Sequence, residues 1–232
     1  MRVFCNISVF ALAVIFLFVF ATKGPDKNVS YAAHADELYQ QLSLEKDSLS
    51  KDIFELALKG LEKGIQKNIF DRYSILTIVD MSKSSNAKRM YVIDLERKTV
   101  LFHTYVAHGR NTGEEFARSF SNEPESQMSS IGFYKTEETY DGLSGLALRL
   151  KGLDKGYNDN AREREIVVHG AVYVGEGFIK KYRMQGRSWG CPAVPMREHK
   201  EIINTIKDGT CLFVFYPEVD YLMNSPFLND RN

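Results

Sequence analysis

The sequence predicts a mostly β domain with a few packed helices, an α+β fold preceded by a helical segment. Short apolar segments rich in Val, Ile, Phe and Tyr recur from residue 74 onward, separated by polar and Gly-containing turns. Helical spacing of apolar residues is clearest before residue 71. The chain has 232 residues and three cysteines. It can therefore bury one sizeable core, and it has no multi-disulfide framework.

The N-terminus has the features of an export signal. Arg2 precedes an unbroken apolar run over residues 9–21, which is the length of a secretory h-region and short for a membrane span. The small residues at 32–35 fit a signal-peptidase site. We expect residues 1–35 to be a signal peptide that is cleaved after Ala35, and the protein to be exported to the periplasm or cell envelope. The alternative is an uncleaved membrane anchor over the looser run 3–21.

Residues 36–70 are predicted to form a helical lead. Ser50 suits a helix N-cap, and apolar residues recur every four positions from Ile53 to Ile65, which gives a helix one apolar face. We expect this face to pack on the domain that follows. A spacer from the membrane is the alternative.

The domain itself is expected over residues 71–217, with a C-terminal tail over 218–232. A polar loop over residues 109–130 is too long for a simple turn, and loops of this length are more often functional than idle. A good helix is expected over 195–208, with Pro at its first turn and Gly209 after its end, and a weaker helix over 177–184. The expected strands are 74–79, 89–95, 99–107, 131–136, 145–150, 165–168 and 211–216.

Charge and motif content exclude several function classes. The chain has 30 Lys and Arg against 30 Asp and Glu, so it has no polybasic footprint for nucleic acid. There is no phosphate loop and no dinucleotide fingerprint, and the His, Cys and carboxylate residues lack zinc-ligand spacing. We therefore expect no cofactor, no metal and no nucleic-acid partner. No obligate protein partner is predicted, and membrane contact is expected only if the N-terminal segment stays uncleaved.

Chemistry is concentrated around Cys191. The cysteine lies in a polar loop over residues 186–193, between Gly190 and Pro192, which is poor core material and leaves room for a substrate carbonyl. His169 ends an apolar run twenty-two residues earlier, and an imidazole near a thiol is the usual base that makes it nucleophilic. His108-Gly109 is a second His-Gly pair, either lining the site or structural. Cys211 lies in an apolar strand pattern typical of a core residue.

These residues carry a resemblance to bacterial cysteine L,D-transpeptidases. The family mark is a His-Gly pair followed by Ser-x-Gly-Cys, found here as His169-Gly170 and residues 188–191. The chain resembles in particular the branch of murein L,D-transpeptidase catalytic-domain proteins, over about residues 71–217. Further segments similar to that branch are 102–111, 119–122, 129–134, 158–162 and 186–193. The resemblance implies a β-sandwich or barrel fold.

The resemblance also implies a reaction on peptidoglycan stem peptides. Cys191 would form an acyl-enzyme with release of the terminal D-Ala, and an acceptor amine would resolve it into a 3→3 cross-link. His169 is the implied base, and Ser188 or a main-chain carbonyl orients its second nitrogen. The implied oxyanion donors are the main-chain N–H groups near Gly190 and Cys191.

The substrate-binding residues that we expect are Arg187, Trp189, His108 and Gly170. Other members of the family carry Arg or Asn two residues after the cysteine, where this chain has Ala193, and Arg187 is the candidate that supplies the positive charge instead. An L,D-carboxypeptidase of the same fold is the alternative activity. A non-catalytic cell-wall binding domain is the alternative of a different class.

Overall fold

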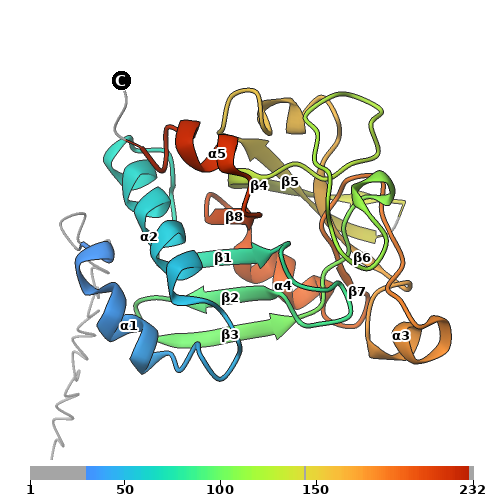
Figure 1. Cartoon of the computed structure of the whole chain (residues 1–232), viewed down its shortest axis with the longest axis horizontal. Helices are drawn as coiled ribbons and strands as arrows, with labels where there is room; N and C mark the ends of the chain where they lie inside the picture. The colour runs from blue at the N-terminus through green and yellow to red at the C-terminus, as the bar shows by residue number, and fades with distance from the viewer. Residues whose placement is uncertain (1–29, 144, 230–232) are drawn as a thin grey trace, which may run out of the picture.

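The computed structural model describes residues 30–143 and 145–229. Its helices in chain order are η1 (Ala32–His34), α1 (Ala35–Gln41), α2 (Lys51–Gln66), η2 (Arg110–Thr112), η3 (Asp159–Ala161), α3 (Glu176–Tyr182), α4 (His199–Ile206) and α5 (Val219–Asn224). Its strands are β1 (Ile75–Asp80), β2 (Met90–Asp94), β3 (Thr99–Thr104), β4 (Gly132–Gly142), β5 (Gly145–Gly152), β6 (Val167–Ala171), β7 (Ala193–Pro195) and β8 (Cys211–Phe215). The prediction of a mostly β fold with packed helices is confirmed (Figure 1).

The eight strands form one mixed sheet in the order β3-β2-β1-β8-β4-β5-β6-β7. The neighbours β1–β8 and β6–β7 run parallel, and the other neighbouring pairs run antiparallel. The chain that continues from β3 pairs with the opposite end of the sheet, where Ala107 N–H donates to Ala193 O of β7 at 2.8 Å. The sheet is therefore curled into a nearly closed barrel.

The core lies on both sides of this sheet. Every residue of β1 is buried, because α2 packs on β1 and β8 while α4 packs on β1, β5 and β6. The strand β1 is not a neighbour of β5 and β6 in the sheet, yet α4 contacts all three. This helix therefore lies on the concave side of the curled sheet. Under α2, Phe133 stacks on Phe213 with ring centroids 4.2 Å apart. A Cβ at Gly60 would lie 1.9 Å from the Phe133 ring, so this position of α2 requires glycine.

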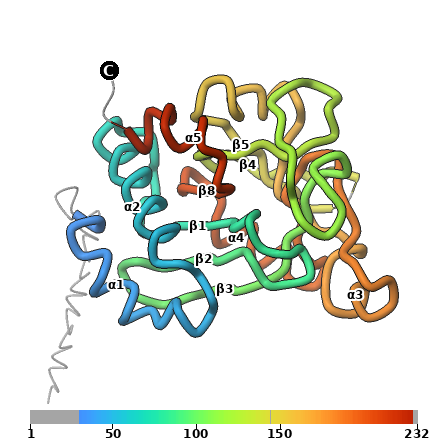
Figure 2. Tube along the Cα trace, in the orientation of Figure 1, coloured from blue at the N-terminus to red at the C-terminus, as the bar shows by residue number. Residues whose placement is uncertain are grey.

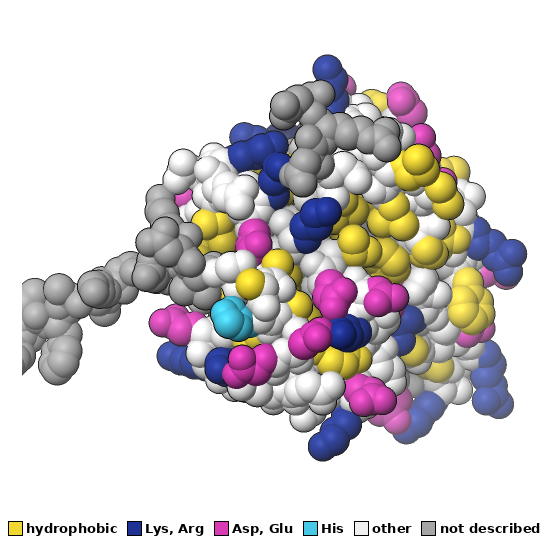
Figure 3. All heavy atoms as spheres, turned by 60° about the vertical axis from the view of Figure 1, so that its left-hand side comes forward, with side chains coloured by type: hydrophobic (Ala, Val, Ile, Leu, Met, Phe, Trp, Pro, Cys, Tyr) yellow, Lys and Arg dark blue, Asp and Glu magenta, His cyan; other side chains and the backbone are white. Residues whose placement is uncertain are grey.

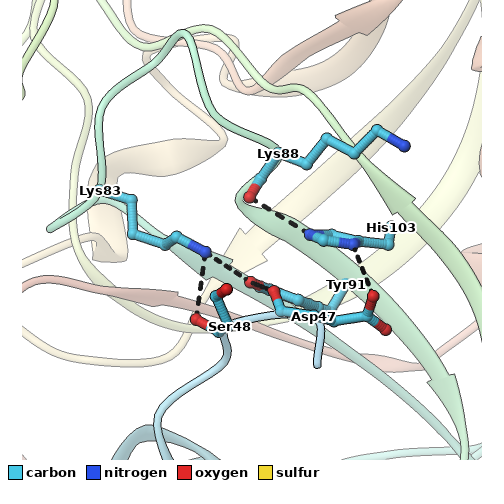
Figure 4. Close-up of polar contacts among 6 residues, drawn as sticks. All are labelled: Asp47, Ser48, Lys83, Lys88, Tyr91 and His103. Atoms are coloured by element: carbon cyan, nitrogen blue, oxygen red, sulfur yellow. Dashed lines mark hydrogen bonds and ion pairs between the residues drawn. The ribbon is translucent and has the colours of Figure 1, made fainter. Parts of the chain in front are cut away.

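The helical lead is two helices, α1 and α2, instead of a continuous one. The chain between them turns at Ser43 and Ser48, which both have positive φ. Figure 4 shows how this turn is fixed to β2 and β3: Tyr91 OH donates to Asp47 O at 2.8 Å, and Asp47 Oδ1 lies 3.1 Å from His103 Nδ1. Lys83 Nζ donates to Ser48 O and to Tyr91 OH. The helical lead is thus attached to the sheet in two ways: by the polar contacts of the turn between α1 and α2, and by the packing of α2 on β1 and β8.

Most of the predicted signal segment, residues 1–29, lies outside the described residues. The predicted cleavage site does not: Ala35 is buried and is the first residue of α1. Just before it, Ala32 N–H and Ser30 Oγ both donate to Glu62 Oε1 of α2, at 2.8 and 2.9 Å. In the folded protein the bond after Ala35 is therefore inside a packed helix, and cleavage there stays a prediction.

The predicted elements differ from the observed ones in their bounds, two of them by four residues or more at one end. The helix expected over residues 195–208 begins at His199, because Ala193–Pro195 instead pairs with β6 as the short strand β7. The strand expected over 131–136 continues to Gly142 as β4. The C-terminal tail is also ordered through α5, where Tyr221 and Ser225 donate to the buried carboxylate of Asp154.

Candidate active site

The nucleophile loop, residues 186–193, connects α3 to β7 and holds Cys191 at the barrel surface. Cys191 is a free, partly exposed thiol whose sulfur donates to Glu165 O at 3.6 Å. Gly190 has φ +125°, and a Cβ there would lie 2.7 Å from Met128 O. Glycine is therefore required for the sharp turn that presents the cysteine.

The surroundings of Cys191 keep its thiol protonated near neutral pH. Burial of the group raises its pKa, while the main-chain N–H of Val167 and the Arg164 guanidinium act in the opposite direction. Because the raising effect is larger, the thiol needs a base before it can attack a carbonyl.

His169 is placed to be that base. It lies in β6 and pairs with Ala193 of β7, so the loop that carries Cys191 enters β7 directly beside His169. His169 Nδ1–H donates to Gly170 O at 3.0 Å, which leaves Nε2 with its lone pair. Burial, and secondarily the neighbouring His199, lower the pKa of His169. The imidazole is therefore neutral and able to accept a proton near pH 7.

The sulfur and this imidazole are not hydrogen-bonded to each other, because the thiol is turned toward Glu165 O. Rotation about the Cα–Cβ bond of Cys191 moves the sulfur away from that carbonyl. Catalytic pairs are often loose before substrate binds.

Ser188 does not have the predicted role of orienting His169. Its hydroxyl donates to Cys191 O at 2.6 Å and accepts from Gly190 N–H at 3.1 Å. Gly170 O orients the imidazole instead. The reason is that Ser188 closes the turn around the nucleophile, so its hydroxyl is used within its own loop.

The same turn changes the predicted oxyanion donors. Gly190 N–H is occupied by the Ser188 hydroxyl. Cys191 N–H donates to no other residue of the part of the chain that the structure describes, so it remains available as a main-chain donor of this loop.

His108 and Gly170 are enclosed by protein. His108 is 1% exposed, its Nδ1 accepts from Arg89 at 2.8 Å, and its Nε2–H donates to Gly113 O at 3.2 Å. Both ring nitrogens are therefore used, and burial lowers the pKa of His108 to about 4. At Gly170, the ring of His199 occupies the side-chain space, since a Cβ would lie 2.6 Å from its Cγ. Both residues support the site from below its surface.

Trp189 and Arg187 flank the nucleophile on its solvent side. The Trp189 side chain is 74% exposed. Arg187 is half-buried, and its guanidinium donates to Gly113 O at 3.4 Å. Both side chains can be reached from solvent, and their role in substrate binding stays a prediction.

Arg164 is a site residue that the sequence did not indicate. Its guanidinium donates to Ser121 O and Met128 O at 2.7 and 2.6 Å, and to the hydroxyls of Ser126 and Ser130 at 3.1 Å. These bonds hold the polar loop over residues 109–130 against the segment between η3 and β6. In the trace of Figure 2 the yellow-green chain of this loop lies on the same side of the molecule as α3.

Ser129 extends the same support, since its hydroxyl donates to Gly190 O at 2.9 Å and accepts from Gly109 N–H at 3.0 Å. The predicted functional loop thus contributes to the site as a scaffold. The sequence signals for this loop were its length and its polar composition over residues 109–130.

Other classes of site find no support in the described residues. No group of three or more His, Cys, Asp or Glu side chains there is arranged to hold a metal ion. None of the helices in residues 30–143 and 145–229 is both long enough and apolar enough to cross a membrane. On the face that carries α1 and α2, basic and acidic side chains are interspersed (Figure 3).

Comparison with known proteins gives one family match. Residues 45–215 match the L,D-transpeptidase catalytic domain family. No curated protein sequence matches at a significant level.

Several solved structures are similar. The cell shape determining protein Pgp2 (K307A mutant) of Campylobacter jejuni is 13% identical with a TM-score of 0.41, over 67% of this chain and 52% of that one. An L,D-transpeptidase of Mycobacterium smegmatis is 14% identical with a TM-score of 0.37, over 62% and 59%. One of Xylanimonas cellulosilytica is 14% identical with a TM-score of 0.36, over 66% and 68%. This chain thus spans little more than half the length of the first.

Proposed function

The chain belongs to the L,D-transpeptidase catalytic domain family, and on that premise we propose that it is a cysteine-dependent L,D-transpeptidase acting on peptidoglycan stem peptides. The observation that carries the proposal is the position of Cys191 in the loop that runs into β7, beside His169 of β6. The thiol is partly exposed in a glycine turn, and the neutral imidazole lies on the adjoining strand with Nε2 unoccupied. This pair fits acyl transfer through a thioester.

The first half of the reaction forms the acyl-enzyme. His169 Nε2 takes the proton from the Cys191 sulfur, and the sulfur attacks the carbonyl of the third stem residue. Cys191 N–H donates to the oxyanion of the tetrahedral intermediate. The intermediate collapses as the C–N bond breaks, and the imidazolium returns its proton to the amine of the departing D-Ala.

The second half transfers the acyl group. The amine of a second stem peptide attacks the thioester carbonyl, and His169 accepts the amine proton. The C–S bond then breaks, and the imidazolium returns the proton to the departing thiolate of Cys191. The product is an amide between two third-position residues, a 3→3 cross-link. When water replaces the amine, the same steps give a tripeptide and the enzyme acts as an L,D-carboxypeptidase.

Product analysis tests the proposal directly. The purified protein is incubated with disaccharide-tetrapeptide, and the products are identified by mass spectrometry. A dimer that has lost one D-Ala is expected, and Cys191→Ala should abolish it. Cys211→Ala is the matched control, because Cys211 is a buried free thiol in β8 and should leave the product unchanged. Unaltered substrate with the folded wild-type protein, or product from Cys191→Ala, would refute the proposal.

We also propose that the protein is exported, which the apolar run over residues 9–21 supports. Cell fractionation with a C-terminal tag should find the full protein in the envelope fraction, and deletion of residues 1–29 should retain it in the cytoplasm. N-terminal sequencing of the exported form then distinguishes cleavage from an anchor that begins at Met1. Recovery of the undeleted protein in the cytoplasm would contradict export.

A further inference from the structure

A cavity of about 370 Å³ lies beside the first residues of the nucleophile loop. Neither Cys191 nor His169 lines it. One wall is α3 with the turn that follows it, and the other is the start of the nucleophile loop together with η2. The lining residues that matter for its chemistry are Arg110, Phe178, Tyr182, Met184, Arg187 and Trp189.

Two guanidinium groups give this cavity its charge. Neither Arg110 nor Arg187 forms an ion pair with any carboxylate of the described residues, and the one bond of the Arg187 guanidinium goes to a main-chain carbonyl. Arg110 is held in place through its backbone, because its N–H donates to Ser188 O at 2.8 Å. Two arginines without a counter-charge favour a bidentate, carboxylate-bearing ligand.

Exposed aromatic rings give the cavity its apolar surface. The rings of Phe178 and Tyr182 are 4.4 Å apart on α3, and the side chains of Tyr182 and Trp189 are 54% and 74% exposed. Large rings left in water next to unpaired charges are typical of a recognition surface, where they pack on peptide planes and aliphatic chains.

The cavity lies within reach of the nucleophile. Trp189 is two residues before Cys191. Gly186, in the cavity wall, is so close to Tyr173 that a Cβ there would lie 2.5 Å from the Tyr173 side chain. Burial raises the pKa of Tyr173, and a negative charge on Cys191 raises it further. Tyr173 therefore lies near both the cavity wall at Gly186 and Cys191, and part of that wall belongs to the loop that carries the nucleophile.

We propose that this cavity binds a carboxylate-bearing segment of a stem peptide, with its carboxylate on Arg110 and Arg187 and its chain on the rings of Phe178, Tyr182 and Trp189. The inference rests on the proposed function for the identity of the peptide. The donor and acceptor stems both carry free carboxylates, so either can be the occupant, and the experiment below separates them.

Binding is measured without catalysis. Trp189 is the only tryptophan of the chain, so its fluorescence reports on this cavity. The full-length Cys191→Ala protein is titrated with disaccharide-tetrapeptide and with the same molecule whose carboxylates are amidated. We expect a saturable fluorescence change with the acidic peptide, and at least about ten-fold weaker binding for the amidated one and for Arg110→Gln/Arg187→Gln.

Arg183→Gln is the matched control. Arg183 ends α3 and is exposed, but its side chain does not line the cavity, so this variant should bind like the parent. Thermal unfolding verifies that all variants are folded. Equal affinity for the amidated peptide, an equal loss in Arg183→Gln, or no fluorescence change would overturn the inference.

Kinetics with the Cys191 enzyme identify the occupant. If the donor stem fills the cavity, Arg110→Gln/Arg187→Gln raises the tetrapeptide concentration needed for half-maximal acylation, followed as acyl-enzyme by intact mass. If the acceptor fills it, acylation is unchanged and the acceptor concentration needed for cross-linking rises. No change in either step overturns the inference even when cross-links form. If the acidic peptide binds specifically but is not converted, the inference that the cavity binds a carboxylate stands, and the proposed function is refuted instead.

Discussion

Replacing Arg164 by glutamine should loosen the loop that supports the nucleophile. The guanidinium of Arg164 is half-buried and donates hydrogen bonds to main-chain carbonyls at Ser121 and Met128 and to the hydroxyls of Ser126 and Ser130. Glutamine is shorter and has one amide group, so it cannot reach all four acceptors. The loss is expected to lower both the free energy of unfolding and the reactivity of Cys191.

The magnitude follows from the two short bonds. A hydrogen bond from a charged donor contributes about 1.5–3 kcal/mol, and the half-buried position favours the lower value. The carbonyl bonds of 2.7 and 2.6 Å therefore account for about 3 kcal/mol, while water replaces most of the contribution of the longer hydroxyl bonds. Arg162→Gln is the control: Arg162 is more than half exposed and pairs with Glu137 and Glu138, so its loss should cost less than about 1 kcal/mol.

Urea unfolding of the two variants measures the difference in stability. Alkylation of the thiol by iodoacetamide at pH 7 measures reactivity, because the Arg164 charge lowers the pKa of Cys191 and its removal should raise that pKa and slow the reaction. The reasoning is refuted if Arg164→Gln is no less stable than Arg162→Gln. An unchanged alkylation rate would separately show that Arg164 acts on the loop without acting on the thiol.

The remaining predictions concern Gly170, His108 and Cys191. Gly170→Ala places a Cβ 2.6 Å from His199 Cγ and should lower the free energy of unfolding in urea by about 1–3 kcal/mol, whereas Gly177→Ala, with no atom within 4 Å, should not. The pKa of His108 is near 6.5 when unfolded and about 4 when folded, so the unfolded state binds more protons between these values and stability should fall by up to about 3 kcal/mol as pH drops from 6.5 to 4. His108→Gln should lack that slope in urea titrations at pH 7, 5 and 4, and an identical slope would contradict the assignment. Because burial raises the pKa of Cys191, its alkylation rate should still be rising at pH 9, and a plateau by pH 7 would indicate a thiolate-imidazolium pair instead.

The strands could be predicted because buried strands consist of short apolar runs that are visible in the local sequence. β1 and β8 are buried throughout, and their apolar runs are unbroken in the sequence. β7 was missed because Ala193–Pro195 is three residues long and ends in proline, which at the start of a polar segment favours a helix. Its pairing depends on β6, which no local pattern reveals.

Residue type and neighbours were enough to single out Cys191 and His169 as the candidate pair, but they did not indicate the contacts that support the two residues. Gly170 O orients His169, whereas the Ser188 hydroxyl is bonded to Cys191 O within its own turn. Arg164 reaches acceptors 34 to 43 residues away in the chain. Contacts between residues so far apart in sequence depend on the tertiary fold. The residues next to Arg164 in the sequence do not indicate which acceptors its side chain reaches.

The near-closure of the sheet also limits how a peptide can dock. An open edge strand offers a row of unpaired N–H and C=O groups, and many domains capture extended peptides by adding them as a further strand. Here Ala193 O already accepts from Ala107, Ser188 N–H already donates to His108 O, and Pro195 has no N–H to offer. The outer side of β7 thus lacks a continuous ladder, so a peptide ligand has to be selected by side chains and loop groups instead of by strand addition at that edge.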